Sequence, residues 1–122
     1  MLIDLGKWWN GRTDNWPMPL GGNVVRRDLG QHVMEDITKY TKMSIEYALK
    51  SPEDALEFAK EWGRGIDDDT NKEFVGMYVN ERTIDYEDEG RASIRQFITE
   101  GQDLGLIDPG FDVQKIDFIG SV

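Results

Sequence analysis

The chain has 122 residues, no cysteine and a formal net charge of −10, from 24 acidic and 14 basic side chains. The lack of cysteine excludes disulfides, thiolate nucleophiles and zinc or iron–sulfur sites that use cysteine ligands. The acidic balance argues against nucleic acid and anionic membrane surfaces as partners, because both attract clustered Lys and Arg side chains.

The length predicts one domain or part of one over residues 1–122. A compact monomer of 14.0 kDa exposes about 6,700 Å², roughly one third of the surface of its unfolded chain. The N-terminus lacks a basic region followed by an apolar run, and no apolar segment reaches membrane-spanning length. These features predict a cytoplasmic protein without a membrane segment.

A brief helical turn is expected near the start of the chain, where Trp8 and Trp9 are adjacent. Neighbouring residues of a helix point about 100° apart, so we expect one ring to pack inward and the other to lie at an edge. Base stacking is the weaker alternative, because no basic groove accompanies the rings.

Residues 20–25 read as a short buried strand that follows a stiff entry containing Pro17 and Pro19. The strand is interrupted by Gly21 and Gly22, which leave the backbone uncovered. One interpretation is a tight strand with a bulge that glycine permits; the other is a backbone that a ligand approaches closely.

The longest predicted helix covers about residues 31–50. Its apolar side chains recur at spacings of three and four, which defines one helical face. The residues of this predicted buried face are Val33, Ile37, Tyr40, Ser44 and Tyr47. A second helix is expected after Ser51 and Pro52, a capping residue followed by proline at the first helical position. The two helices should form an antiparallel hairpin.

A third helix should begin at Asp67, and a fourth should cover about residues 87–104 and end at Gly105. The tail shows a local alternation around Ile116 and Phe118, typical of an edge strand or an ordered extended segment. The acidic run 67–69 is better explained by helix capping than by Ca²⁺ binding, because the spacing of an EF-hand loop is absent.

The sequence shows little catalytic chemistry of its own. His32 is the only histidine, without a second histidine or an acid at metal-ligand spacing that would suggest a metal site. A serine-type site would need His32, and no nucleophile motif lies near it. We therefore expect no catalytic residue, no metal site and no cofactor in this chain.

Three segments carry a family resemblance: PMPLGGNVVRRDLG at residues 17–30, FVGMYVN at residues 74–80, and DLGKWW at residues 4–9. Thr83, Asp85 and Tyr86 continue the second segment. Together, in their order along the chain, the segments resemble 1,4-dihydroxy-6-naphthoate synthases of the futalosine route to menaquinone. The resemblance covers nearly the whole chain but only about the C-terminal half of a family member.

The resemblance implies a helix-rich α/β fold: the C-terminal portion of a two-lobed, periplasmic-binding-protein type II-like structure with about four helices and one or two short strands. It implies a metal-free lyase that converts cyclic dehypoxanthinylfutalosine to 1,4-dihydroxy-6-naphthoate. The proposed catalytic histidine of the family lies upstream and has no counterpart here, and His32 does not inherit its role. The implied residues that line the substrate site are Leu20, Gly21, Gly22 and Asn23.

The implied partners are a small-molecule substrate and either the missing N-terminal lobe or a second copy of this chain. Two alternatives stay open. One is a non-catalytic lobe that binds a small molecule, and the other is an acidic helical interaction domain in which the glycines are purely structural.

Overall fold

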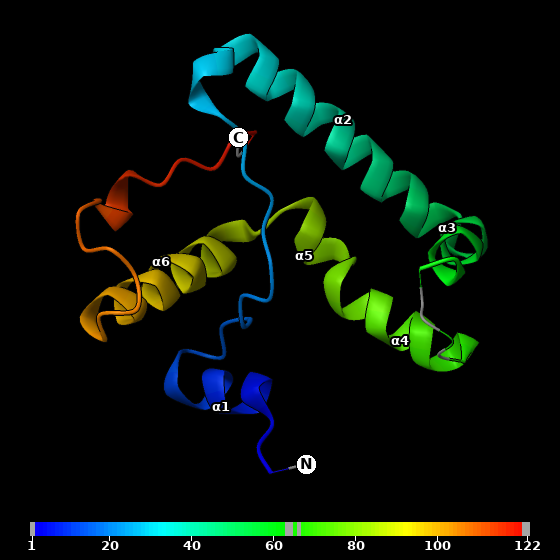
Figure 1. Ribbon diagram of the computed structural model, residues 1–122, viewed down its shortest axis with the longest axis horizontal. Coiled ribbons are helices and arrows are strands. Elements are labelled where there is room, and N and C mark those ends of the chain that lie inside the picture. Colours follow the sequence, from blue (N-terminus) through cyan, green and yellow to red (C-terminus); the bar gives the residue numbers. More distant parts are fainter. Residues whose placement is uncertain (1, 63–64, 66, 121–122) are drawn as a thin grey trace. The chain divides into compact units, whose positions relative to one another are not determined.

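The computed structural model describes residues 2–62, 65 and 67–120. Throughout these residues the secondary structure consists of helices and turns, without a β-strand (Figure 1). The chain folds as two compact units. Unit 1 comprises the start of the chain up to Asn23 together with Tyr86–Phe118, and unit 2 comprises Val24–Asp85 with the end of the chain.

Unit 1 is built on helices α1 (Leu5–Arg12) and α6 (Glu87–Asp103). The side chain of Asp4 caps α1 by accepting a hydrogen bond from the Lys7 amide. Trp9 is 1% exposed and its indole meets Phe97 of α6 edge-on, with ring centroids 5.5 Å apart. The expectation that one tryptophan packs inward is therefore confirmed for Trp9, whereas Trp8 is 42% exposed.

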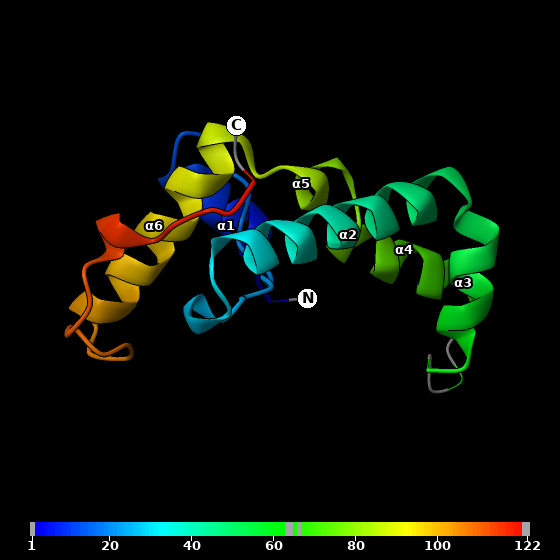
Figure 2. The same ribbon diagram turned by 90° about the horizontal axis from the view of Figure 1, so that it is seen from above.

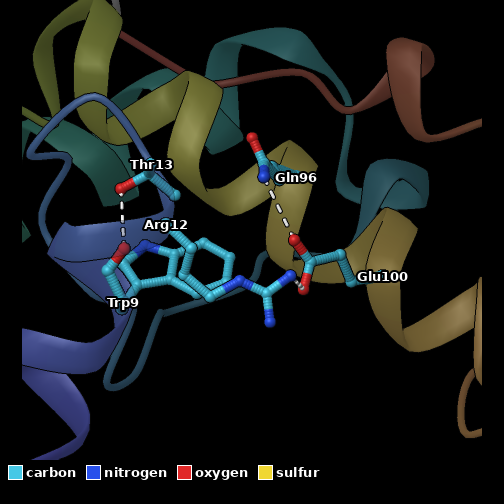
Figure 3. Close-up of polar contacts among 5 residues, drawn as sticks. All are labelled: Trp9, Arg12, Thr13, Gln96 and Glu100. Carbon is cyan, nitrogen blue, oxygen red and sulfur yellow. Dashed lines mark hydrogen bonds and ion pairs between the residues drawn. The ribbon is translucent and has the colours of Figure 1, made fainter.

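Polar contacts reinforce the packing of α1 on α6 (Figure 3). Arg12 forms an ion pair of 3.0 Å with Glu100, whose other carboxylate oxygen accepts a hydrogen bond of 3.1 Å from Gln96. The hydroxyl of Thr13 donates to the carbonyl of Trp9 at the end of α1. These contacts fix the place where the chain leaves α1.

The tail of unit 1 turns back onto α6 and carries the 3₁₀ turn η2 (Val113–Lys115) (Figure 1). Gly105 adopts φ +70°, a left-handed conformation that suits glycine, and the amide of Leu106 donates to the carbonyl of Gly101. The helix end expected at Gly105 is thus confirmed. The tail is extended around Ile116 but belongs to no sheet, so of the two predicted forms the edge strand is wrong.

The described residues of unit 2 form the 3₁₀ turn η1 and four α-helices. Their bounds are η1 (Arg27–Leu29), α2 (Gln31–Lys50), α3 (Pro52–Lys60), α4 (Asp68–Tyr78) and α5 (Glu81–Ile84). After α2, α3 runs across the end of that helix instead of folding back along it (Figure 2). Contacts with α2 come from α3 at this end and from α5, which follows later in the chain. The antiparallel hairpin predicted for the first two of these helices is therefore wrong.

The helix starts in unit 2 follow local sequence. Pro52 occupies the first turn of α3, and Asp67 caps α4 by accepting hydrogen bonds from the amide and hydroxyl of Thr70. The short helix α5 was not predicted from the sequence. Asn80 and Thr83 start it with a reciprocal capping box.

The fold-class prediction, α/β with one or two short strands in a two-lobed fold, is wrong for the part of the chain that the structure describes. Residues 20–25 are extended backbone without a ladder partner. A strand is stable only when its amides and carbonyls pair with a neighbouring strand, and the described residues supply none.

The apolar faces predicted to be buried are largely exposed. On α2, Val33 and Ile37 are each 41% exposed, and Tyr40 and Tyr47 are 63% and 64% exposed. Among the described residues, the buried hydrophobic side chains are Trp9, Met34 and Val113.

The exposed area shows the same deficit of packing. Its value is 9,641 Å², whereas even two separate globules of half this mass would together expose about 8,100 Å². The chain thus exposes at least about 1,500 Å² more surface than two separate compact globules would, so its division into two units does not explain the excess.

Candidate functional site

The candidate site is the glycine segment, defined as Leu20, Gly21, Gly22 and Asn23, which leads out of unit 1. All four residues are exposed, with Leu20 at 53%. The segment is not covered by the helices of its own unit.

The backbone conformation does not require glycine at either Gly21 or Gly22. Gly21 and Gly22 do not have positive φ angles, so their conformations are open to other residues. A Cβ at Gly21 would meet no described atom within 4 Å, and a Cβ at Gly22 would meet only the hydroxyl of Tyr86, at 3.8 Å. The bare backbone therefore faces open space, with one phenol beside it.

The entry to the glycine segment is held by buried and part-buried polar contacts. Ser93 of α6 is fully buried; its hydroxyl accepts a hydrogen bond of 2.9 Å from the indole of Trp9 and donates one of 2.7 Å to the carbonyl of Pro17. Asn10 donates to the carbonyl of Trp16 at 2.6 Å. The contacts of Ser93 join segments 76 and 84 residues away along the chain. This link has no local sequence signal, and the sequence did not predict it.

The polar residues after the glycine segment pair with one another within unit 2. Arg26 donates hydrogen bonds to the carboxylate of Asp28 through Nε and Nη2. This pairing raises the pKa of the Arg26 guanidinium and lowers the pKa of the Asp28 carboxyl. Both side chains are exposed, so the pair adds little stability.

An aromatic group adjoins the glycine segment within unit 1. Tyr86 meets Phe118 of the tail edge-on, with ring centroids 5.9 Å apart and an interplanar angle of 84°. The guanidinium of Arg95 lies 4.9 Å from the centroid of Phe118 and donates to the carbonyl of Ile116. Tyr86 was noted only as part of a matched segment; its position beside Gly22 is a finding of the structure.

His32 and two residues of the matched segment 74–80 have structural contacts. The side chain of His32 is 88% exposed, and its Nε2 atom lies 3.6 Å from a carboxylate oxygen of Asp36. Asn80 caps α5 and donates to the carbonyls of Gly76 and Met77, while the ring of Tyr78 packs on Phe74.

Two structural features are absent from the described chain. Among these residues, no group of three or more His, Cys, Asp or Glu side chains could hold a metal ion. No helix of the described chain has the length and apolar character needed to cross a bilayer.

Comparison with known proteins gives concordant results. Residues 1–103 match a family model described as menaquinone biosynthesis. The 1,4-dihydroxy-6-naphthoate synthase of Thermus thermophilus is 33% identical over 108 residues, which are 88% of this chain and 39% of that protein. The synthase of the same name from Streptomyces coelicolor is 31% identical over 106 residues, 87% of this chain and 37% of that protein.

The crystal structure of an Archaeoglobus fulgidus protein is also similar, with a TM-score of 0.79 and 34% sequence identity. The similarity covers 87% of this chain and 40% of that one. The chain thus spans about two fifths of the length of the relatives it matches. Because the family model covers most of the sequence and the relatives agree with it, the chain belongs to the menaquinone biosynthesis family.

Proposed function

We propose that this chain is part of a 1,4-dihydroxy-6-naphthoate synthase and contributes the glycine segment to its substrate site. The observation that carries the proposal is the match of 87–88% of the chain to two synthases of that name. The resemblance described above implies a lyase reaction on cyclic dehypoxanthinylfutalosine, in which the proton-abstracting histidine comes from family sequence that these 122 residues do not span.

The geometry of the glycine segment supports a role in binding. Gly21 and Gly22 are exposed, are not needed for the backbone conformation, and have open space where a side chain would lie. Backbone without side chains lets a ligand approach amide and carbonyl groups closely. The substrate-lining role of Leu20 and Asn23 is part of the same proposal.

The partner that we propose is the remaining three fifths of the family sequence. The uncovered area of at least about 1,500 Å² is as large as one side of an obligate interface. The Archaeoglobus fulgidus protein supports this assignment, because there a similar helical arrangement occupies 40% of the chain. The apolar face of α2, formed by Val33, Ile37, Tyr40 and Tyr47, is part of the surface to be covered.

The test is co-expression of the 122-residue chain with the region of the Thermus thermophilus synthase that it does not match. We expect co-purification and formation of 1,4-dihydroxy-6-naphthoate from cyclic dehypoxanthinylfutalosine, and neither polypeptide alone should be active. A co-purified complex without turnover, under conditions in which the complete Thermus enzyme is active, would contradict the lyase assignment and favour a binding lobe. Self-association of this chain, without capture of the other region, would contradict the proposed partner.

A pair of variants tests the docking surface. Tyr40→Glu places a charge in the apolar face of α2 and should abolish co-purification. Gln31→Glu is the control, because it introduces the same charge nine residues away, on the opposite side of the helix. Equal behaviour of the two variants would show that this face of α2 is not covered in the complex.

A second pair tests the glycine segment. Gly22→Ala should fold normally, since a Cβ there meets only the Tyr86 hydroxyl at 3.8 Å, but it should weaken substrate binding. Gly11→Ala also adds a methyl group into open space and should leave binding unchanged. If Gly22→Ala binds as tightly as the parent, the bare backbone is not a ligand contact.

A further inference from the structure

The surroundings of Gly22 point to one side chain outside the glycine segment. Apart from the residues next to Gly22 in the chain, the Tyr86 hydroxyl is the sole described group within 4 Å of the space above this glycine. A group bound against the backbone of Gly22 would therefore lie beside this phenol. A phenol both donates and accepts hydrogen bonds and offers an apolar ring.

Two contacts within unit 1 place Tyr86. Its ring meets Phe118 edge-on, an arrangement favoured by the quadrupoles of the two rings. Phe118 is itself placed by the Arg95 guanidinium, which lies 4.9 Å from its centroid and bonds the carbonyl two residues before it. The carboxyl tail thus reaches Tyr86 through two ordered contacts.

The second contact is at the base of the side chain, where Gly90 of α6 leaves room for the Cβ of Tyr86. A Cβ at Gly90 would lie 3.1 Å from the Cβ of Tyr86, closer than side chains normally pack. Glycine inside a helix costs about 1 kcal/mol relative to alanine. The space taken by Tyr86 is the physical reason for glycine at this buried position.

We propose that Tyr86 is a ligand-binding residue of the glycine segment, with its phenol beside the Gly22 backbone, and that it selects a flat aromatic ligand bearing a hydroxyl group. The ring of such a ligand packs on the ring of Tyr86 and the glycine backbone, and its hydroxyl exchanges a hydrogen bond with the phenol. Gly90 and Phe118 act as positioning residues because they fix the orientation of Tyr86. This inference rests on the proposed function, which makes the glycine segment part of a substrate site.

The experiment compares two probes by NMR titration of the ¹⁵N-labelled 122-residue chain, with the Gly21 and Gly22 amide signals as the local readout. The probes are 1,4-dihydroxy-6-naphthoate, kept anaerobic because it oxidises readily, and 2-naphthoate, which lacks both hydroxyls. The parent chain should prefer the dihydroxy compound by about tenfold, the value of one net hydrogen bond. Tyr86→Phe retains the ring and should reduce this preference to about twofold or less.

Two further variants test the positioning of the ring with the hydroxyl still present. Gly90→Ala should displace Tyr86 and lower the preference at least about threefold. The control Gly76→Ala, also a helical glycine, adds a methyl group into open space and should leave the preference unchanged. Phe118→Leu should act like Gly90→Ala, and together these two variants decide the question if Tyr86→Phe does not fold.

The outcomes separate this inference from the proposed function. If neither probe moves the glycine signals of the parent chain, the binding role of the glycine segment fails, and the role of Tyr86 fails with it. If both probes bind equally, or if Tyr86→Phe keeps the parental preference, only the inference about Tyr86 is overturned. An unchanged preference in both Gly90→Ala and Phe118→Leu overturns the positioning roles.

Discussion

Ser93 offers the sharpest test of how the entry to the glycine segment is held. Its buried hydroxyl accepts from the Trp9 indole and donates to the Pro17 carbonyl, at 2.9 and 2.7 Å. Ser93→Ala removes both bonds at once. Leaving a buried polar group unsatisfied costs about 1–3 kcal/mol. The Trp9 indole is buried, whereas the Pro17 carbonyl is only part-buried and loses less, so the two groups together predict a loss of roughly 2–4 kcal/mol in the free energy of unfolding.

The assay is urea unfolding of the 122-residue chain, followed by far-UV circular dichroism and tryptophan fluorescence. With a slope of about 1–3 kcal/mol per molar urea, the expected loss lowers the midpoint by about 1 M or more. Thr99→Ala is the matched control. It also deletes a hydroxyl from α6, but this hydroxyl is exposed and bonds the carbonyl of Arg95 within the same helix. Its effect should stay within about 0.5 kcal/mol.

A double-mutant cycle refines the test. Trp9→Phe removes the donor, so Ser93→Ala should cost about 1 kcal/mol less in that background than in the parent. The reasoning is refuted if Ser93→Ala costs no more than Thr99→Ala. It is also refuted if the two substitutions at Trp9 and Ser93 are additive.

Three further predictions concern the ends and edges of the units. The carboxyl of Asp67 has a pKa below its usual value because the Thr70 amide donates to it; its stabilising effect is therefore present above about pH 4 and lost as the pH falls through the lowered pKa. The protection of the Thr70 amide against hydrogen exchange, expressed relative to the intrinsic exchange rate at each pH, should fall on acidification in the parent but not in Asp67→Asn, which keeps an uncharged acceptor. Arg12→Ala removes a partly exposed ion pair with Glu100 and should cost no more than about 1 kcal/mol, an effect that salt reduces; a larger loss in urea unfolding would contradict this reading. Val113→Ala truncates a side chain that is only 6% exposed and should lower the free energy of unfolding by about 1–2 kcal/mol. Amide hydrogen exchange should become faster in the tail and change less in α1; unchanged exchange in the tail would show that η2 does not anchor it.

Local sequence determined most of the helices. These helices depend on residues that lie less than two turns apart. Examples are the three- and four-residue spacing of α2, the Ser51–Pro52 start of α3 and the Asp67 cap of α4. The end of α6 at Gly105 is equally local, because it needs one residue with positive φ. The resemblance in the matched segments identified the family without any structure, because it depends on residue identities alone.

Which apolar face is buried was not determined by local pattern. The spacing of Val33, Ile37 and Tyr40 predicts a shared face, and they share one, but burial depends on what else is present to cover it. The predicted strand at residues 20–25 failed for the same reason, since a ladder needs a partner that the described chain does not provide.

The sequence by itself determined the family, the helix periods and the caps. Only the tertiary structure decided that Ser93 ties Pro17 to Trp9 and that Tyr86 lies beside Gly22. These contacts join residues far apart in the sequence, and such pairings are set by how α1, α6 and the tail pack, which no local spacing encodes.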